Sequence, residues 1–275
     1  MIKIEFPFRT EEEWNSIERH FATRWNYSNC IGCIDGKHIQ MVKPPNSGSV
    51  YYNYKKTFSI SLLAVVTADY RFIAYDVGRP GRMSDAGIWL RSQLRRHFEP
   101  TDQYNPLNIP KAEKLADHTG RVDTNGPKIP YHIVGDDGFG LSSSLIKPYN
   151  KVMDAMKDVF NYRLSRTRQT VEVAFGILAN RFRVLHNRVH CLPKNAQLIV
   201  ESCLILHNFL STKRPITSKC DIERAKSYYP LLNQLPNQRK PRDGPASLSS
   251  ALEIRDYIKE YFVTTYPIRM QYDNL

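Results

Sequence analysis

The stretch Cys33–Ile39, with the sequence CIDGKHI, decides how the rest of the chain is read. It is a strand-like run that carries a single carboxylate, Asp35, among apolar residues. Burying an ionised carboxylate is costly unless the group is paired or holds a cation. We therefore expect Asp35 to be paired with another group or to hold a cation together with residues elsewhere in the chain.

Two further stretches supply acids in similar settings. Tyr131–Asp136 (YHIVGD) is a second apolar run that ends in an acid, and Glu172 stands in the apolar segment Val171–Gly176. Three carboxylates from two strands and a helix suit one or two hard divalent cations, because such ions prefer oxygen ligands.

Glu172 occupies the flank of an amphipathic helix. Apolar residues recur at helical spacing through this segment, which predicts one buried stripe; they are Val171, Phe175, Leu178, Phe182 and Leu185. Glu172 lies about 100° from Val171, where a side chain can reach the edge of a sheet. The alternative is a surface pair of Glu172 with Arg168, which would stabilise the helix by only ~0.3–0.5 kcal/mol.

Composition indicates a folded protein with a polyanionic partner. The 275 residues carry a formal net charge of +12 and are 41% hydrophobic. Nucleic acid is the first candidate partner and an acidic membrane surface the second, while an ordinary basic surface is the plain alternative. No run approaches the ~18 apolar residues of a membrane-spanning helix, and no signal-peptide pattern is seen, so we expect a soluble intracellular protein.

The cysteines favour reduced thiols over a disulfide framework. There are five of them, scattered along the chain. Cys30 and Cys33 form a Cys-x-x-Cys pair, but no second pair or Cys/His cluster stands at zinc-ligand spacing. We expect buried thiols, with a zinc site as the less favoured alternative.

Strand and helix signals alternate along the first hundred residues. Thr10–Glu13 has the form of a capping box and predicts a helix before the first acidic strand. Two long strand signals, Thr57–Ala68 and Tyr70–Val77, predict an antiparallel hairpin. The next helix begins at Ser84 or Asp85, either of which can act as its N-cap. Asp85 is thus either a cap or a member of the acidic site.

The second half is expected to alternate between helices and polar stretches. The sequence of residues 99–130 predicts a surface insertion before the second acidic strand. A helix is expected from about Met153 to Leu185, broken near Asn161, and another over Ala196–Leu210, in which His207 is either packed or functional. A polar linker and a C-terminal helix complete the chain.

The order of these elements predicts an α/β fold, namely a ribonuclease H-like mixed sheet flanked by helices. Three antiparallel strands open it, and a helix and a parallel strand follow. The expected domains are an N-terminal helical segment (1–29), a nuclease domain (30–212, with its insertion at about 99–130), and a linker with the C-terminal helix (213–275).

Five motifs taken together resemble those of the PIF/Harbinger-type DDE transposases and the nucleases derived from them. The similarity covers roughly residues 14–210. The motifs are CIGCIDGKH at Cys30–His38, PNSGS at Pro45–Ser49 with Tyr54 and Lys55 after it, GDDGF at Gly135–Phe139, VEVAFG at Val171–Gly176, and LHNF at Leu206–Phe209.

The resemblance implies a DDE nuclease in which Asp35, Asp136 and Glu172 are catalytic and bind Mg²⁺ or Mn²⁺. It also implies Asp85 as a fourth metal ligand. Asp137 stands where the family has a small residue, which leaves open whether Asp136 alone or both acids face the cation. Because side chains alternate along a strand, we expect Asp136 to be the ligand and Asp137 to cap backbone amides of the turn.

A two-metal mechanism then follows, in which one ion activates a water or a DNA 3′-hydroxyl and the other stabilises the leaving oxygen. DNA phosphates would be neutralised by basic residues near the acids, and tyrosines beside Lys55 would either stack on bases or pack at a sheet edge. The basic candidates are Lys55, Lys56, Arg79, Arg82, Arg166, Arg168, Arg181 and Arg183.

The family also implies a division of labour. Its elements encode a separate Myb-like DNA-binding protein, and this chain starts close to its catalytic strand. We therefore expect sequence-specific targeting to come from such a partner or from additional N-terminal residues, with an oligomer possible. The expected location is the nucleus, or the cytoplasm without the partner. The alternative function is a catalytically inactive, domesticated transposase that binds nucleic acid or acts as a scaffold.

Overall fold

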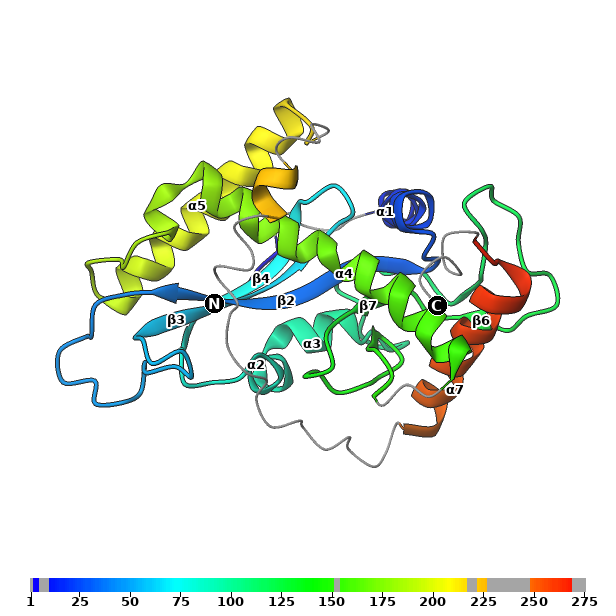
Figure 1. Ribbon diagram of the computed structural model, residues 1–275, viewed down its shortest axis with the longest axis horizontal. Coiled ribbons are helices and arrows are strands. Elements are labelled where there is room, and N and C mark those ends of the chain that lie inside the picture. Colours follow the sequence, from blue (N-terminus) through cyan, green and yellow to red (C-terminus); the bar gives the residue numbers. More distant parts are fainter. Residues whose placement is uncertain (1, 5–9, 151–153, 217–221, 227–247, 269–275) are drawn as a thin grey trace. The chain divides into compact units, whose positions relative to one another are not determined.

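The computed structural model describes residues 2–4, 10–150, 154–216, 222–226 and 248–268 (Figure 1). The chain forms two compact units. The first comprises Met1–Phe6, Ile34–Arg95 and Thr170–Arg239, and the second comprises Pro7–Cys33, Arg96–Gln169 and Lys240–Leu275. The boundary falls inside strand β2 (Cys30–Gln40) and inside helix α4 (Ala155–Arg181), so each of these elements contributes residues to both units.

The first unit is built on antiparallel strands. Its strand order is β1-β4-β3-β2, with β1 (Ile2–Ile4), β3 (Ser59–Val66) and β4 (Phe72–Pro80). Ala64 of β3 pairs with Tyr75 of β4. Every residue of β3 is buried, as expected for a strand covered on both faces. The helices of this unit are α2 (Asp85–Arg91), α5 (Pro193–Lys213), the C-terminal part of α4 and the short 3₁₀ helix Arg183–Leu185; α3 (Gln93–Phe98) starts here.

The second unit is built on parallel strands. The N-terminal part of β2 pairs with β7 (His132–Val134), which pairs in turn with β8 (Leu145–Ile146). Cys33 is opposite Val134 in this register. The remaining elements are α1 (Glu11–Trp25), the small antiparallel pair β5 (Glu113–Lys114) and β6 (Lys128–Ile129), α7 (Leu248–Glu260) and a π-helical turn, Tyr261–Thr265.

The predicted mixed sheet flanked by helices is confirmed. The hairpin is β3 and β4, and the parallel strand before Asp136 is β7. The capping box of α1 is present, since Thr10 accepts a hydrogen bond from the Glu13 amide and the Glu13 side chain accepts one from the Thr10 amide. Ser84 is the N-cap of α2, with its hydroxyl accepting from the Gly87 amide.

One expectation about the helices was wrong, and two short strands were not predicted. Helix α4 is continuous through Asn161, because the side chain of Asn161 bonds the backbone of Tyr149 and not its own helix. The short strands β1 and β8 were not predicted, since two or three residues are too few to show a period.

Residues 99–130 are anchored at several points. Leu107, Ile109, Leu115 and Ile129 are buried, and the indole of Trp14 donates to the Leu107 carbonyl. Whether this segment is an insertion into a domain stays a prediction, as do the domain boundaries. The predicted linker lies for the most part outside the described residues.

Cys30 and Cys33 are buried free thiols, as expected. The Cys33 thiol donates to the Thr167 carbonyl (3.1 Å). In the described ranges, no helix combines the length and the apolar character needed to cross a membrane.

Candidate active site

Asp35 and Lys37 lie on one face of β2, in the first unit. Side chains alternate along a strand, so these two share a face while Gly36 between them points to the other. Both are nearly excluded from solvent, with exposed fractions of 7% for Asp35 and 9% for Lys37. One oxygen of Asp35 accepts a hydrogen bond from the Gly36 amide (2.8 Å). The strand therefore carries a buried anion and a buried cation side by side.

Helix α4 follows this face of β2. The ammonium of Lys37 lies 5.9 Å from the ring centroid of Phe175 on α4. Cys33, one pleat before Asp35, contacts Thr167 of the same helix. Glu172 is half-buried on the same helix, three residues before Phe175.

Asp85 approaches β2 at Gly36. A Cβ atom added to Gly36 would lie 1.9 Å from Oδ1 of Asp85, so any larger residue would displace this carboxylate. Because Ser84 provides the N-cap of α2, Asp85 is the first residue within the helix and is not the cap. Its carboxylate is thus directed at the acidic strand, while its role as a metal ligand stays a prediction.

Lys55 belongs to the same charged cluster. Burial lowers the pKa of Lys55, and the carboxylates of Asp85 and Asp35 act in the opposite direction. Burial lowers the pKa of Lys37 to about 8, with a further contribution from Lys55 and an opposing one from Asp35. The strand residue after Lys37, His38, has its pKa lowered to about 4 by burial and then by Lys55. Two acids and two lysines thus influence one another in a desolvated setting.

The loop that carries Lys55 is fixed by Asn53. The Asn53 amide donates to the Ser59 hydroxyl (2.8 Å), and its carbonyl oxygen accepts from the Thr57 amide (3.0 Å). Ser59 is also bonded to His38 Nδ1 (3.0 Å). The loop is therefore tied to β2 and β3, which holds Lys55 close to the acids.

Asp136 belongs to the second unit, two residues beyond the end of β7. It is half-buried, and its Oδ1 accepts a hydrogen bond from the Gly138 amide (3.0 Å). Asp136 thus caps one amide of this turn, and the capping role expected of Asp137 stays a prediction. Cys33, two residues before Asp35, pairs with Val134, two residues before Asp136.

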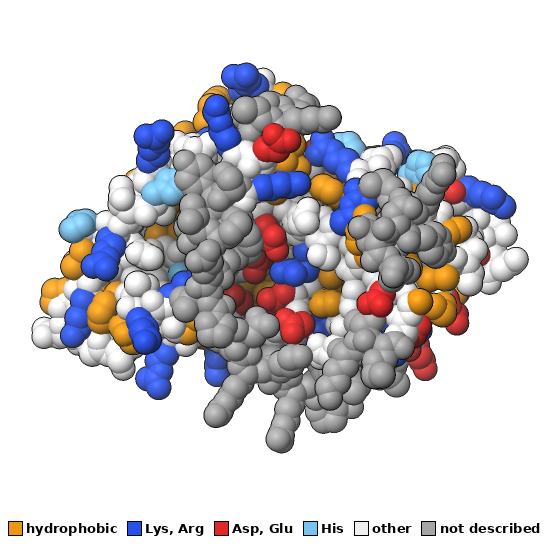
Figure 2. Space-filling view, viewed as in Figure 1, with side chains coloured by type: hydrophobic (Ala, Val, Ile, Leu, Met, Phe, Trp, Pro, Cys, Tyr) orange, Lys and Arg blue, Asp and Glu red, His pale blue; other side chains and the backbone are white. Residues whose placement is uncertain are grey.

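The basic candidates divide into two groups. Arg79 forms an ion pair with buried Asp76 (3.1 Å), and Arg181 donates to the His207 carbonyl (3.3 Å) and the Ser211 hydroxyl (2.9 Å), so both guanidinium groups hold the fold. The others are exposed or half-buried: Lys55, Lys56, Arg82, Arg166, Arg168 and Arg183. Figure 2 shows Lys and Arg side chains spread over the left part of the molecular face, where α5 and β3 lie in Figure 1.

Sequence reasoning gave no role to Lys37, although the signal was present. Lys37 follows Asp35 by two positions in an apolar run, and such spacing puts a cation on the face of the acid. His207, by contrast, is a packed residue: it is buried, and its Nε2 bonds the Tyr70 carbonyl (2.8 Å).

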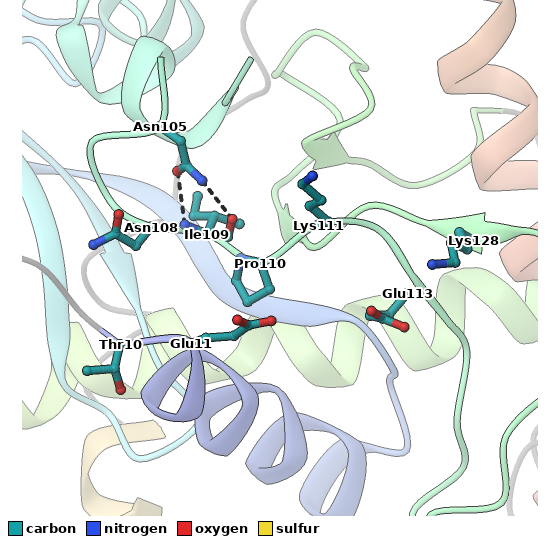
Figure 3. Close-up of a pocket in the computed structure, with 9 residues that line it drawn as sticks. All are labelled: Thr10, Glu11, Asn105, Asn108, Ile109, Pro110, Lys111, Glu113 and Lys128. Atoms are coloured by element: carbon teal, nitrogen blue, oxygen red, sulfur yellow. Dashed lines mark hydrogen bonds between the residues drawn. The ribbon is translucent and has the colours of Figure 1, made fainter. Parts of the chain in front are cut away.

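A pocket of the second unit lies apart from these acids. Figure 3 shows its lining, which comes from the start of α1 and from residues 105–128. The volume is about 620 Å³, and the walls mix Glu11 and Glu113 with Lys111 and Lys128. It contains none of the predicted catalytic residues.

The donor chemistry of the acidic cluster fits a hard divalent cation, since carboxylate oxygens are the ligands that Mg²⁺ and Mn²⁺ prefer. Buried Lys37 and half-buried Lys55 bring two cations close to Asp35. In the part of the chain that the structure describes, no three His, Cys, Asp or Glu side chains form a group that could hold a metal ion. Asp35 accepts from the Gly36 amide, the Asp85 carboxylate lies where a Gly36 side chain would be, and Glu172 is on α4, whose Phe175 lies near Lys37.

Comparison with known proteins agrees with the motifs. Residues 34–208 match the family described as "DDE superfamily endonuclease". The chain is 31% identical over 212 residues to "Protein ALP1-like" of Arabidopsis thaliana, which covers 75% of this chain and 48% of that protein. The chain thus spans about half the length of this relative. No solved structure gives a significant match. The chain belongs to the DDE superfamily endonucleases, as its resemblance to Harbinger-type transposases implied.

Proposed function

We propose that the chain is a metal-dependent endonuclease that cuts DNA phosphodiester bonds, with Asp35, Asp136 and Glu172 holding the cation. The observation that carries the proposal is the almost fully buried Asp35 in the middle of β2, with Glu172 on the facing helix. Burying an ionised acid is costly, and groups of buried charges are concentrated at functional sites.

The strand arrangement supports a ribonuclease H-like fold. Antiparallel β3 and β4 precede the parallel strand β7, which pairs with the first acidic strand. The assignment of Asp35 and Asp136 to one cation rests on the family motifs that carry them, CIGCIDGKH and GDDGF.

A bound Mg²⁺ or Mn²⁺ would supply two things, an acidified water and neutralisation of charge on the phosphate. The protein's own residues provide the setting. Asp35 is held by the Gly36 amide, and the burial of this face keeps bulk water away from it. Lys55, in its anchored loop, offers a cation to an incoming phosphate, and Lys37 balances the charge of the acids.

DNA is the proposed substrate because the chain carries a net charge of +12 and exposed arginine and lysine side chains. The described elements include no recognised base-reading module, so binding by this chain is proposed to follow phosphate charge. Recognition of specific DNA sequences is then proposed to come from a Myb-like partner. The nucleus is the proposed location.

The second candidate is a domesticated, inactive transposase that binds nucleic acid. The observation in its favour is that the described residues include no three-ligand group of His, Cys, Asp and Glu. It differs from the first candidate in one measurable respect, because it predicts DNA binding without metal-dependent cleavage.

Nicking of supercoiled plasmid separates the two candidates. The intact chain is incubated with plasmid in Mg²⁺, in Mn²⁺ or in EDTA, and Asp136→Asn is compared with Asp137→Asn as its matched neighbour. We expect nicking only with metal, its loss in Asp136→Asn and its survival in Asp137→Asn. Equal nicking in EDTA, or no nicking by the unaltered chain under any metal, would overturn the endonuclease proposal. A reversed pattern in the two variants would move the ligand to Asp137.

A further inference from the structure

Helix α5 is apolar on two opposite faces. Its inner face packs on β3 and β4 through buried Val200, Leu204 and His207. On the opposite side lie large apolar side chains between 43% and 57% exposed: the contiguous Ile205, Leu206, Phe209 and Leu210 and, one turn beyond exposed Ser202, Leu198. Phe209 lies about 180° around the helix from Val200. We call these five residues the outer stripe of α5.

Such a stripe is unusual for a helix on a protein surface. A surface helix has one apolar face and one polar face, and a helix that is apolar all round is normally covered on both sides. Single exposed apolar residues need no explanation, but a contiguous row marks an interaction site. The outer stripe therefore indicates a partner that covers it.

The charges around the stripe identify the kind of partner. The exposed charged residues of α5 are Lys194 near its start and Lys213 near its end, and Arg214 follows immediately; Glu201, the acidic residue of this helix, is buried. Lys213 lies 5.8 Å from the ring centroid of Phe209, so a cation adjoins the apolar row itself. An apolar row between two cationic ends is complementary to an apolar row with acidic flanks.

A second copy of the chain fits the charges poorly. Packing α5 on α5 brings Lys194 against Lys213 and Arg214 in an antiparallel pair, and like residues together in a parallel pair. DNA would satisfy the cations but would leave the apolar side chains without a partner. We propose that the outer stripe of α5 docks an amphipathic helix of another protein, one with a leucine-type face and glutamate or aspartate at its flanks. The inference is independent of the endonuclease function.

Binding of a designed helical peptide to the intact chain tests this proposal. The probe is a fluorescein-labelled peptide with leucine at the seam positions and glutamate at the flanks. The matched peptide has lysine in place of each glutamate. We expect fluorescence anisotropy to show at least ten-fold tighter binding of the glutamate peptide.

Two sets of variants locate the binding site. Ile205→Gln combined with Phe209→Gln changes only outward-facing side chains and should weaken the glutamate peptide at least ten-fold. Val122→Gln is the matched control, because Val122 is a comparably exposed apolar residue in the second unit, and it should leave binding unchanged. Lys194→Glu with Lys213→Glu should reduce or reverse the preference between the two peptides.

Several results would overturn the proposal. These are absence of binding by the glutamate peptide, equal binding of the two peptides, or equal binding by the Ile205→Gln/Phe209→Gln variant. A concentration-dependent dimer that this variant abolishes would assign the stripe to a second copy. Binding to vesicles of phosphatidylserine and phosphatidylcholine, lost in the same variant and exceeding peptide binding, would assign it to a membrane surface.

Discussion

The acidic strand β2 and the inner face of helix α5 both bury polar side chains, but they do so in different ways. On α5, Asn208 accepts from the Phe72 amide (3.0 Å) and donates to the Phe72 carbonyl (2.7 Å), while His207 bonds the Tyr70 carbonyl. On β2, Asp35 and Lys37 gather with Lys55 and Asp85 as mutually interacting charges.

This difference distinguishes two motifs of the chain. The LHNF motif on α5 stabilises the fold, whereas the CIGCIDGKH motif on β2 carries the charges of the candidate site. The polar atoms of α5 complete the hydrogen bonds of a strand edge, which is what a buried polar group needs in order to be tolerated. On β2, Asp35 accepts a hydrogen bond from the Gly36 amide, and burial lowers the pKa of Lys37 to about 8. Removing a residue should therefore cost stability on α5 and activity on β2.

Asn208→Ala should have the largest effect on stability. It leaves the amide and the carbonyl of Phe72 buried without their partner, which costs ~1–3 kcal/mol for each group and so about 2–6 kcal/mol in the free energy of unfolding. Urea denaturation measures this value. Asn195→Ala on the same helix is the control, because Asn195 is exposed, and it should change stability by less than ~0.5 kcal/mol. Similar losses of stability in Asn208→Ala and Asn195→Ala would show that the bonds from Asn208 to Phe72 do not stabilise the fold.

Acid should destabilise the fold partly through His207. Burial is the main cause that lowers the pKa of His207 to about 4, against 6.5 for the free side chain. Because the unfolded chain binds a proton near pH 6.5 while the folded one stays neutral, stability should fall as the pH drops from about 6.5 to about 4 and level off above that window.

His207→Gln removes this titration and keeps a donor for the Tyr70 carbonyl. Its free energy of unfolding should depend on pH less steeply than that of the unaltered chain, by at most ~1.4 kcal/mol per pH unit. Urea unfolding at pH 7.5 and at pH 5 measures the difference, and exposed His190→Gln serves as the control. An unchanged pH dependence in His207→Gln would show that the pKa of His207 is the same in the folded and the unfolded chain.

Gly36→Ala should have a smaller effect on stability, ~1–2 kcal/mol, together with reduced cleavage. The added Cβ would fall 1.9 Å from Oδ1 of Asp85, and the carboxylate must move away from β2. Gly140→Ala is the matched control, since a Cβ there meets nothing within 4 Å. Full cleavage by Gly36→Ala in the plasmid assay would show that the position of Asp85 has no bearing on activity.

The smallest effect is expected for single arginines at the end of α4. Arg183 is exposed, so Arg183→Gln should lower the slope of log binding constant against log salt by ~0.9 at most and leave stability unchanged. Arg181 bonds His207 and Ser211, so Arg181→Gln should leave that slope alone and lower stability by about 1 kcal/mol. DNA titrations at several salt concentrations decide between the two patterns.

Much of the fold was predictable because its strands and helices carry long periodic patterns. The hairpin of β3 and β4 was found this way, while β7 was found from the apolar run before Asp136 and the start of α1 from its capping box. Strands β1 and β8 were missed because two or three residues show no period. The continuity of α4 through Asn161 was missed because it depends on a bond to Tyr149, a long-range contact that no local pattern reveals.

The candidate site was predictable in its acids but not in its lysines. Asp35 stood out because a carboxylate in an apolar strand is rare. The effect of Lys55 on Lys37 and His38 depends on how Asn53 folds the loop onto Ser59, which spacing alone does not encode. The ion pair of Arg79 with Asp76, which engages a predicted DNA-binding residue in the fold, was not predicted either.

The most direct test measures cleavage and stability on the same preparation of Asp35→Asn. If β2 carries the chemistry, plasmid nicking in Mg²⁺ should fall at least ~10³-fold, equivalent to about 4 kcal/mol of transition-state stabilisation, while the free energy of unfolding stays within ~1 kcal/mol of the unaltered chain. Nicking at the original rate, or loss of activity that only follows unfolding, would contradict the account.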